Sequence, residues 1–288
     1  MRGKSRETRE LIATSLDLLE EIRPASVRAV CYKLFTLKLI PDMGRNSTGK
    51  ISKVLARARE DGEIPWEYIV DGSRQGIQKL QHENPADFIE SIRTQYSKDR
   101  WEDQDYCVEL WSEKSTVEGV LEPVWNEYGI TFRSLHGFNS ASVINNIAEY
   151  SRSIPHEFIA LYVGDWDPSG MYMSEVDLPG RLERYGGNVK VIRIALVEED
   201  THGLPSFSAH DKRKDPRHEW FVREYGEECW ELDAMDPRDL RERVEVNIAE
   251  YIDWDKWERM AQLESLEFDS LQHYLNGYKF SLEINRQP

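Results

Sequence analysis

The chain has 288 residues and a formal net charge of −16, and 11% of its residues are aromatic. This length fits one large domain or two ordinary ones, and the aromatic content is sufficient for a buried core. No apolar run approaches the roughly 20 residues that span a bilayer, so we expect no membrane association. The three cysteines are scattered and form no CxxC pair. We therefore expect a protein of the reducing cytoplasm, and the charged first residues do not resemble an apolar signal segment.

The strongly acidic balance argues against a simple nucleic-acid-binding protein, which normally has a basic surface. The charge is uneven, however. Residues 1–75 carry 14 basic and 11 acidic residues, a net of +3, which leaves a net of −19 for the rest of the chain. A weakly basic N-terminal part therefore precedes a strongly acidic body.

The N-terminal part, residues 1–80, is predicted to contain three short helices and a hairpin. Apolar spacing and caps place the helices at 6–22, 27–39 and 49–60, and the hairpin at 64–72. Three helices followed by such a wing are the order of a winged helix-turn-helix. The third helix carries Lys50, Lys53 and Arg57, which we expect to contact DNA phosphates. The alternative is a three-helix bundle whose basic residues are only solvated.

The rest of the chain is predicted to form an α/β domain between two helical segments. Residues 81–104 are predicted to form a linker that contains a helix at 84–98. From 105 to 255, strands at 106–111, 130–135, 158–163 and 189–197 alternate with helices at 115–128, 140–152 and 170–185. This alternation predicts a mostly parallel sheet with helices on both faces. Residues 198–216 read as loop and 236–252 as helix. A last helix at 257–274, in a C-terminal extension at 256–288, is expected to pack on the body or on a second subunit.

Acidic residues follow two of the predicted strands. Asp165 and Asp167 come directly after the apolar strand that ends at Val163, and Glu113 follows the strand that ends near Trp111. Ligands of open parallel sheets lie at the carboxyl ends of strands, so the three carboxylates would converge if these strands are neighbours. Three oxygen ligands with room for water suit Mg²⁺ or Mn²⁺ better than zinc. The alternative is that the two aspartates only form an Asx turn before a helix.

A glutamate after one strand and Asp-x-Asp after a later one resemble the Toprim pattern of topoisomerases, primases and some nucleases. The segment from Arg28 to Tyr32, on the second helix of the predicted winged helix-turn-helix, sharpens the likeness. Over residues 10–255 the chain resembles the DNA-cleaving A subunit of topoisomerase VI and its meiotic double-strand-break relative. It departs from them at Cys31, where family members usually carry a second tyrosine.

The resemblance implies a Mg²⁺-dependent enzyme that cleaves duplex DNA. Glu113, Asp165 and Asp167 would bind the metal. Tyr32 would attack the phosphodiester to form a tyrosyl-DNA intermediate, with Arg28 one helical turn before it favouring the phenolate or holding the phosphate. The resemblance also implies a homodimer in which the tyrosine of one subunit completes the metal site of the other. The chain has no ATPase module, so ATP-driven strand passage would need a separate ATPase subunit.

Two other functions stay open at this stage. If Tyr32 is an ordinary core aromatic, an activated water would attack and the protein would be a hydrolytic Toprim nuclease, for example in defence against foreign DNA. The second alternative is a DNA-binding scaffold that does not cut. Lys114, beside the metal glutamate, either contacts phosphate or lies solvated, and His136 and Gly137 follow the second strand at the same edge.

Overall fold

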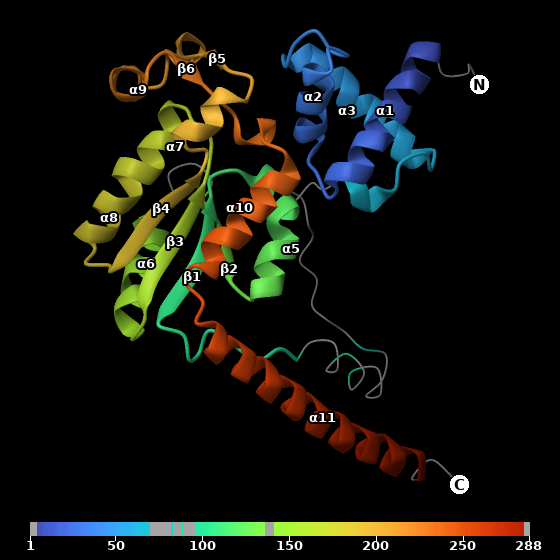
Figure 1. Cartoon of the computed structure of the whole chain (residues 1–288), viewed down its shortest axis with the longest axis vertical. Helices are drawn as coiled ribbons and strands as arrows, with labels where there is room; N and C mark the ends of the chain where they lie inside the picture. The colour runs from blue at the N-terminus through green and yellow to red at the C-terminus, as the bar shows by residue number, and fades with distance from the viewer. Residues whose placement is uncertain are drawn as a thin grey trace. The chain divides into compact units, whose positions relative to one another are not determined.

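The computed structural model describes residues 5–69, 82, 88, 91, 96–135 and 141–284, with side chains as far as 277. The chain divides into two units (Figure 1). One comprises Met1–Arg74 and Val108–Glu250, and the other comprises Gln75–Cys107 and Tyr251–Pro288. Among the described helices, none is sufficiently long and apolar to cross a membrane.

The first unit is built on a four-stranded parallel sheet, as the alternation of strands and helices predicted. Its strands are β1 (Tyr106–Ser112), β2 (Thr131–Ser134), β3 (Glu157–Val163) and β4 (Val189–Ala195), in the order β2-β1-β3-β4. The central strand β3 is buried at every position after Glu157, which explains its unbroken apolar sequence. From β1 the chain passes to β2 at one edge of the sheet, and from β3 it passes to β4 at the other edge. The strand order therefore reverses between the neighbours β1 and β3.

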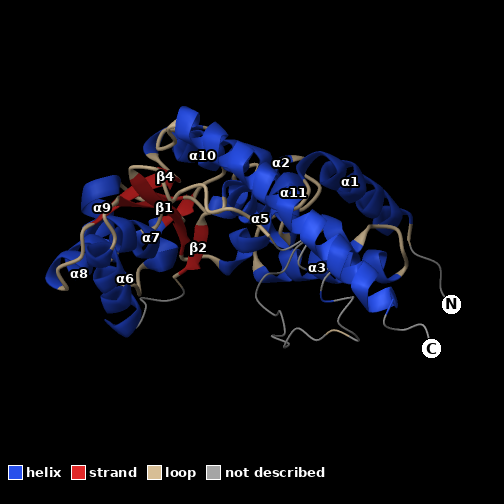
Figure 2. Ribbon diagram, turned by 90° about the horizontal axis from the view of Figure 1, so that it is seen from below, coloured by secondary structure: helices blue, strands red, loops and turns tan. Residues whose placement is uncertain are grey.

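Helices cover both faces of the sheet. α5 (Glu118–Tyr128) and α10 (Pro237–Ala249) pack together on one face, and α6 (Ala141–Ser153) packs with α8 (Leu178–Arg184) on the other. Figure 2 shows the strands with α10 on one side and α6 on the other. The predicted helix at 170–185 is interrupted. α7 (Pro168–Tyr172) passes through one π-helical turn into α8, where Pro179 has no N–H to donate to the preceding turn.

Three helices at the N-terminus share one core: α1 (Arg6–Ile22), α2 (Val27–Thr36) and α3 (Arg45–Glu60). α1 has the predicted bounds. α2 ends three residues before the predicted position because Lys38 takes a left-handed backbone conformation, with φ 58°. α3 begins before Gly49 because Gly44 already serves as its N-cap.

The predicted hairpin at 64–72 is not formed in its described part. Trp66–Tyr68 is a 3-10 turn that begins after Pro65, and Ile69 then forms a single bridge to Ala25. Residues 70–72 lie outside the described residues, as do His136, Gly137 and most of the predicted linker helix at 84–98. Residues 96–99, at the end of that predicted helix, are not helical.

The second unit contains α11 (Trp254–Ile284), which begins earlier and ends later than predicted. The segment before β1 packs along it. Lys98 and Arg100 pair with Glu267 and Glu264, at 3.1 and 2.6 Å. The ring of Trp101 meets that of Trp257 edge to face, with 5.7 Å between their centroids.

Candidate functional site

The three predicted metal ligands lie at the carboxyl ends of β1 and β3, the neighbouring strands between which the strand order reverses. Glu113 directly follows β1, and Asp165 and Asp167 follow β3. This crevice is the usual ligand position of an open parallel sheet. The pKa of Glu113 is raised, first by burial and then by the charges of Asp167 and Asp165. The topology therefore brings the three carboxylates within electrostatic reach of one another.

The loop that carries the two aspartates is fixed by Gly170. Asp167 caps α7 by accepting a hydrogen bond from the Gly170 N–H at its Oδ1, at 2.8 Å. A Cβ on Gly170 would lie 2.3 Å from the carbonyl oxygen of Asp165, so only glycine fits here. Asp167 thus forms the turn that the alternative interpretation expected, but the cap occupies only one of its two oxygens.

Arg193 supports the same loop from behind, and sequence reasoning missed it. This buried guanidinium on β4 donates to the carbonyl oxygens of Gly164 and Gly170, at 3.0 and 2.7 Å. Burial lowers its pKa. Its contacts hold both ends of the loop that bears the aspartates. The signal that could have found it is an arginine inside a strand that is apolar except for Lys190.

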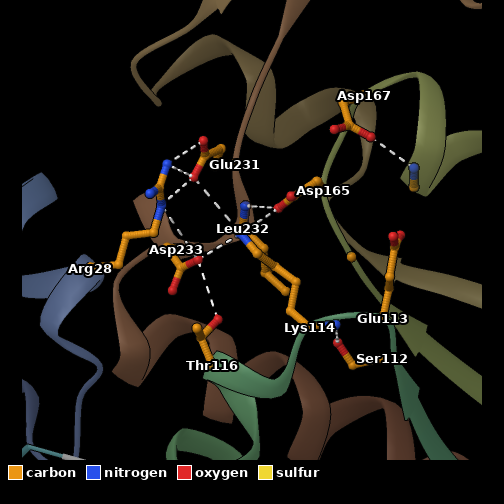
Figure 3. A network of polar contacts seen from close by, with 12 residues as sticks. Arg28, Ser112, Glu113, Lys114, Thr116, Asp165, Asp167, Glu231, Leu232 and Asp233 are labelled. Atoms are coloured by element: carbon orange, nitrogen blue, oxygen red, sulfur yellow. Dashed lines mark hydrogen bonds and ion pairs between the residues drawn. The ribbon is translucent and has the colours of Figure 1, made fainter. Parts of the chain in front are cut away.

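Two lysine ammonium groups neutralise the aspartates. The Nζ atom of Lys114 lies 2.9 Å from Asp165 Oδ1 and 2.6 Å from Asp233 Oδ2, and the Nζ atom of Lys212 lies 2.8 Å from Asp167 Oδ2. Burial by itself would lower the pKa of Lys114, but the charges of Asp165 and Asp233 outweigh it and the pKa is raised. Lys114 is therefore neither solvated nor exposed for DNA contact. Figure 3 shows it among the acidic side chains.

The donor set fits a hard divalent cation by its chemistry, since all three side chains offer carboxylate oxygens. Its present arrangement is not a preformed metal site. Among the described residues, no three acidic, histidine or cysteine side chains stand together so that they could hold a metal ion. Asp165 and Asp167 are bound to lysines instead, so a metal would have to replace those ammonium groups.

A second acidic pair, Glu231 and Asp233, extends the site and was also missed. Backbone hydrogen bonds between Trp166 and Trp230, both 2.9 Å, align this segment with the loop that bears the aspartates. The N–H of Leu232 donates to Asp165 Oδ1 at 2.7 Å. The signal in the sequence is Glu-x-Asp, which has the same spacing as Asp-x-Asp.

This acidic pair also binds the N-terminal helices. Arg28 on α2 forms a two-pronged ion pair with Glu231, and the hydroxyl of Ser26 lies 3.0 Å from Asp233 Oδ1. Figure 3 shows Arg28 reaching Glu231 from the N-terminal helices. The predicted Arg28 thus lies beside the site of its own chain, where it contacts a carboxylate.

Tyr32 is buried, with 6% of its surface exposed. Burial and the charge of Glu231 raise its pKa above the ordinary phenol value, although Arg28 and Lys114 oppose the shift. It lines a cavity of about 370 Å³ together with Arg28, Phe207 and Glu231, among others. The structure brings Tyr32 near the site but in surroundings that disfavour the phenolate.

The three predicted DNA contacts on α3 lie elsewhere, on the exposed side of that helix. Lys50 pairs with Glu7 at 3.4 Å and Arg57 with Asp61 at 4.0 Å, and these side chains are largely exposed. Lys53 is exposed as well. Exposed pairs of this kind are weak, so they leave the basic side chains available to a phosphate backbone.

Comparison with protein-family models finds no match for the chain, and comparison with the curated proteins finds none either.

Proposed function

We propose that the chain is a Toprim-type enzyme that cleaves duplex DNA with Mg²⁺ or Mn²⁺. The observation that carries this proposal is the position of Glu113, Asp165 and Asp167 at the ends of two neighbouring parallel strands. The pKa of Glu113 is raised first by burial and then by the charges of Asp167 and Asp165, and this second cause supports the proposal because it requires the carboxylates to lie near one another. Carboxylates gathered in this way favour a cation, and lysine ammonium groups occupy that role here.

The residues of the site have distinct roles in this proposal. When bound, a divalent cation would supply positive charge to stabilise the phosphate as it is attacked. Glu113 would be held in place by Ser169, whose hydroxyl donates to it at 3.2 Å. Lys212, once displaced from Asp167, would have its ammonium group available for a phosphate oxygen. Lys114 is held by Asp233 as well, so it would stay inside the site.

The described geometry gives more support to hydrolysis than to attack by Tyr32. The phenol is buried, its pKa is raised, and the guanidinium that would activate it is paired with Glu231. A tyrosyl-DNA intermediate would require Arg28 to leave Glu231 and the DNA to reach the buried ring. Hydrolysis by an activated water needs only the carboxylate site.

The remaining parts of the proposal concern the DNA and the partners. The three N-terminal helices would bind duplex DNA through Lys50, Lys53 and Arg57 on α3. The chain would act as a homodimer, and strand passage driven by ATP would require a separate ATPase subunit. The exposure of the basic side chains of α3 supports the DNA contact.

The test is cleavage of supercoiled plasmid in the presence of Mg²⁺ or Mn²⁺, with products separated before and after proteinase treatment. The parent should nick or linearise the plasmid. Asp165→Asn, Asp167→Asn and Glu113→Gln should each abolish cleavage, because each removes one charge from the shared cation site. The control is Glu122→Gln, which removes an exposed charge from α5 and should cut like the parent. Plasmid binding without any cleavage by the parent would favour the non-cutting scaffold.

A further inference from the structure

Next to the carboxylates the protein has an open hollow with aromatic walls. It has a volume of about 560 Å³ and is lined by Tyr172, Pro216, Arg217 and Trp220. The rings of Tyr172 and Trp220 meet edge to face, with 5.1 Å between centroids. Tyr172 is the last residue of α7, and Trp220 lies on α9 (His218–Tyr225), a helix that the sequence analysis did not predict.

A chain of aromatic rings connects this hollow to the metal-ligand loop. Trp220 packs on Tyr225 at 5.5 Å, and Tyr225 packs on Trp166 at 5.3 Å between centroids. Trp166 is the residue between the two aspartates. On the other wall, Tyr172 follows Asp167 by five residues, through the short helix that Asp167 caps. Both walls of the hollow are therefore built directly onto the loop that carries the carboxylates.

The segment beside the hollow is basic in an otherwise acidic protein. Four of the six residues from 212 to 217 are lysine or arginine, although the whole chain has a net charge of −16. Lys212 reaches into the site and binds Asp167, and Arg213 and Lys214 are exposed. Arg217 lies near the carboxylates, since Glu113 and Asp167 help to raise its pKa, after the larger effect of its hydrogen bond to Asp215.

Aromatic faces interleaved with lysine and arginine are the chemistry that binds single-stranded nucleic acid. Bases stack on the rings and the cations follow the phosphates. A paired base inside a duplex cannot offer its face, because it is already stacked on both sides. A hollow of this kind beside a phosphodiester-cleaving site would therefore select a nucleotide that is unpaired.

We propose that Tyr172, Arg217 and Trp220 form a subsite for an unpaired DNA base next to the phosphodiester that is cut, with Lys212, Arg213 and Lys214 holding the adjoining phosphates. The preferred substrate is then duplex DNA with a single-stranded segment at the cleavage point, such as an overhang, a gap or a flap. This inference rests on the proposed function and specifies its substrate.

Binding in EDTA tests the subsite separately from cleavage. Fluorescence anisotropy with labelled DNA compares a single-stranded 12-mer, the blunt duplex of the same sequence, and that duplex with a 3′ or 5′ overhang. The parent should bind the overhang duplexes more tightly than the blunt duplex, because both offer a duplex to α3 and only the overhangs offer an unpaired base. Trp220→Ala should weaken binding of the single strand by roughly tenfold, which is the order expected when one stacking aromatic is lost. The affinity for the blunt duplex should not change.

Two further variants separate stacking from folding. Trp220→Phe keeps an aromatic face and should retain most of the single-strand affinity. Trp125→Ala removes a half-buried tryptophan that stacks on Phe132 at 4.6 Å, and it should bind every DNA like the parent. The inference is wrong if the parent binds the blunt duplex and the overhang duplexes equally tightly. It is also wrong if Trp220→Ala, shown by circular dichroism to be folded, binds single strands as tightly as the parent does. If Trp220→Ala binds single strands as tightly as the parent and also cleaves plasmid at the parental rate, the proposed function stands and only the base subsite is excluded.

Discussion

Individual residues position the candidate site through contacts that the apolar periodicity of the sequence does not predict. Arg193 is the clearest case, since one guanidinium binds backbone carbonyl oxygens at both ends of the loop that carries the aspartates. Gly170 closes the same loop by lying against the carbonyl oxygen of Asp165. The positions of the two aspartates therefore depend on side chains and a backbone contact outside the predicted ligand set.

Gly170→Ala should disturb this loop, because its new Cβ would overlap the carbonyl oxygen of Asp165, 2.3 Å away. We expect a loss of about 1–3 kcal/mol in the free energy of unfolding, or roughly 2–4 °C in Tm per kcal/mol. The control is Gly180→Ala on α8, where nothing lies within 4 Å of the new Cβ. That variant should be slightly more stable than the parent, because alanine favours a helix over glycine. Equal melting temperatures for the two variants would contradict the overlap.

Tyr32→Phe distinguishes the two cleavage routes, because it removes only the phenolic oxygen. If hydrolysis is the route, as the burial of Tyr32 favours, the variant should keep most of the plasmid cleavage and the ends should be free. If Tyr32 is the nucleophile, the parent should leave protein attached to DNA, seen as label that enters the gel only after proteinase treatment. The variant would then bind DNA normally and cut nothing. Covalent ends with the parent would overturn our preference for hydrolysis.

At the scale of elements, α2 joins the N-terminal helices to the sheet domain through several ion pairs at one edge. Besides Arg28, Lys33 on α2 contacts Asp236 Oδ2 at 2.6 Å, and Asp236 also caps α10 by accepting from the Arg238 N–H at 2.8 Å. One carboxylate therefore both begins a helix of the sheet domain and holds α2. Loss of the Asp236 carboxylate would therefore affect both the N-terminus of α10 and the contact between α2 and the sheet domain.

Asp236→Asn should lower stability in a way that depends on pH. Burial by itself would raise the pKa of Asp236, but the hydrogen bonds from Lys33 and from the Arg238 backbone outweigh it, so the pKa is lowered in the folded protein. The ionised form is thus favoured by folding. Its contribution is complete above the unfolded value near 4 and is lost as the pH falls through the lowered pKa.

Urea unfolding can measure this contribution. At pH 7 we expect Asp236→Asn to lose on the order of 1 kcal/mol, because the amide keeps the cap and loses the ion pair. The difference from the parent should shrink below about pH 4, where the carboxyl of the parent becomes protonated. Glu20→Gln, which removes an exposed charge from α1, should behave like the parent throughout. A constant difference between the two curves at every pH would rule out the ion pair as its cause.

The third helix offers a second prediction at this scale. Replacing Lys50, Lys53 and Arg57 on α3 by alanine should weaken binding to every duplex tested, because phosphate contacts carry no sequence information. The slope of log affinity against log salt should shrink by about 0.9 for each lost contact. Arg184→Ala with Lys190→Ala removes two exposed charges from the sheet domain and should leave the slope unchanged. An equal slope for the triple variant and the parent would mean that this face is only solvated.

At the scale of the whole molecule, the proposed function allows two arrangements, with the site completed within one chain or across two chains. In the first unit, Arg28 and Tyr32 lie beside Glu231 of the same chain. The resemblance to the topoisomerase VI A subunit implies instead that the tyrosine of one subunit serves the metal site of another. Only the second arrangement requires a homodimer, so mixing two inactive variants distinguishes the two.

Mixed Tyr32→Phe and Asp165→Asn proteins should regain some single-strand nicking if the tyrosine acts across a homodimer. Each mixed dimer would then contain one site with both an intact tyrosine and an intact carboxylate set. The measurement is plasmid nicking by each variant alone and by the mixture, with the dimer followed by light scattering on DNA. A monomer that cuts at the parental rate would contradict this assembly.

Periodic patterns predicted most of the fold but only part of the site. The four strands and the α1 bounds follow from apolar runs and caps, and the carboxylates follow from the rule that parallel strands end at one edge. Glu231, Asp233 and Lys212 could not be found in this way. They come from loops and short turns whose position depends on tertiary contacts, such as the bridge between Trp166 and Trp230. The short helix α9 was missed for the same reason.

Lys114 and Lys212 neutralise Asp165 and Asp167 from within the chain, so the divalent ion of the proposed function would have to compete with their ammonium groups. A tethered ammonium group competes at an effective concentration that is typically millimolar or higher, whatever the amount of protein in solution. A divalent ion would have to displace these ammonium groups. Half-occupancy of the site should therefore require a higher metal concentration than a site of three unpaired carboxylates would. The protein should also stay folded in chelator, because the two ammonium groups balance the charges of the aspartates without a metal.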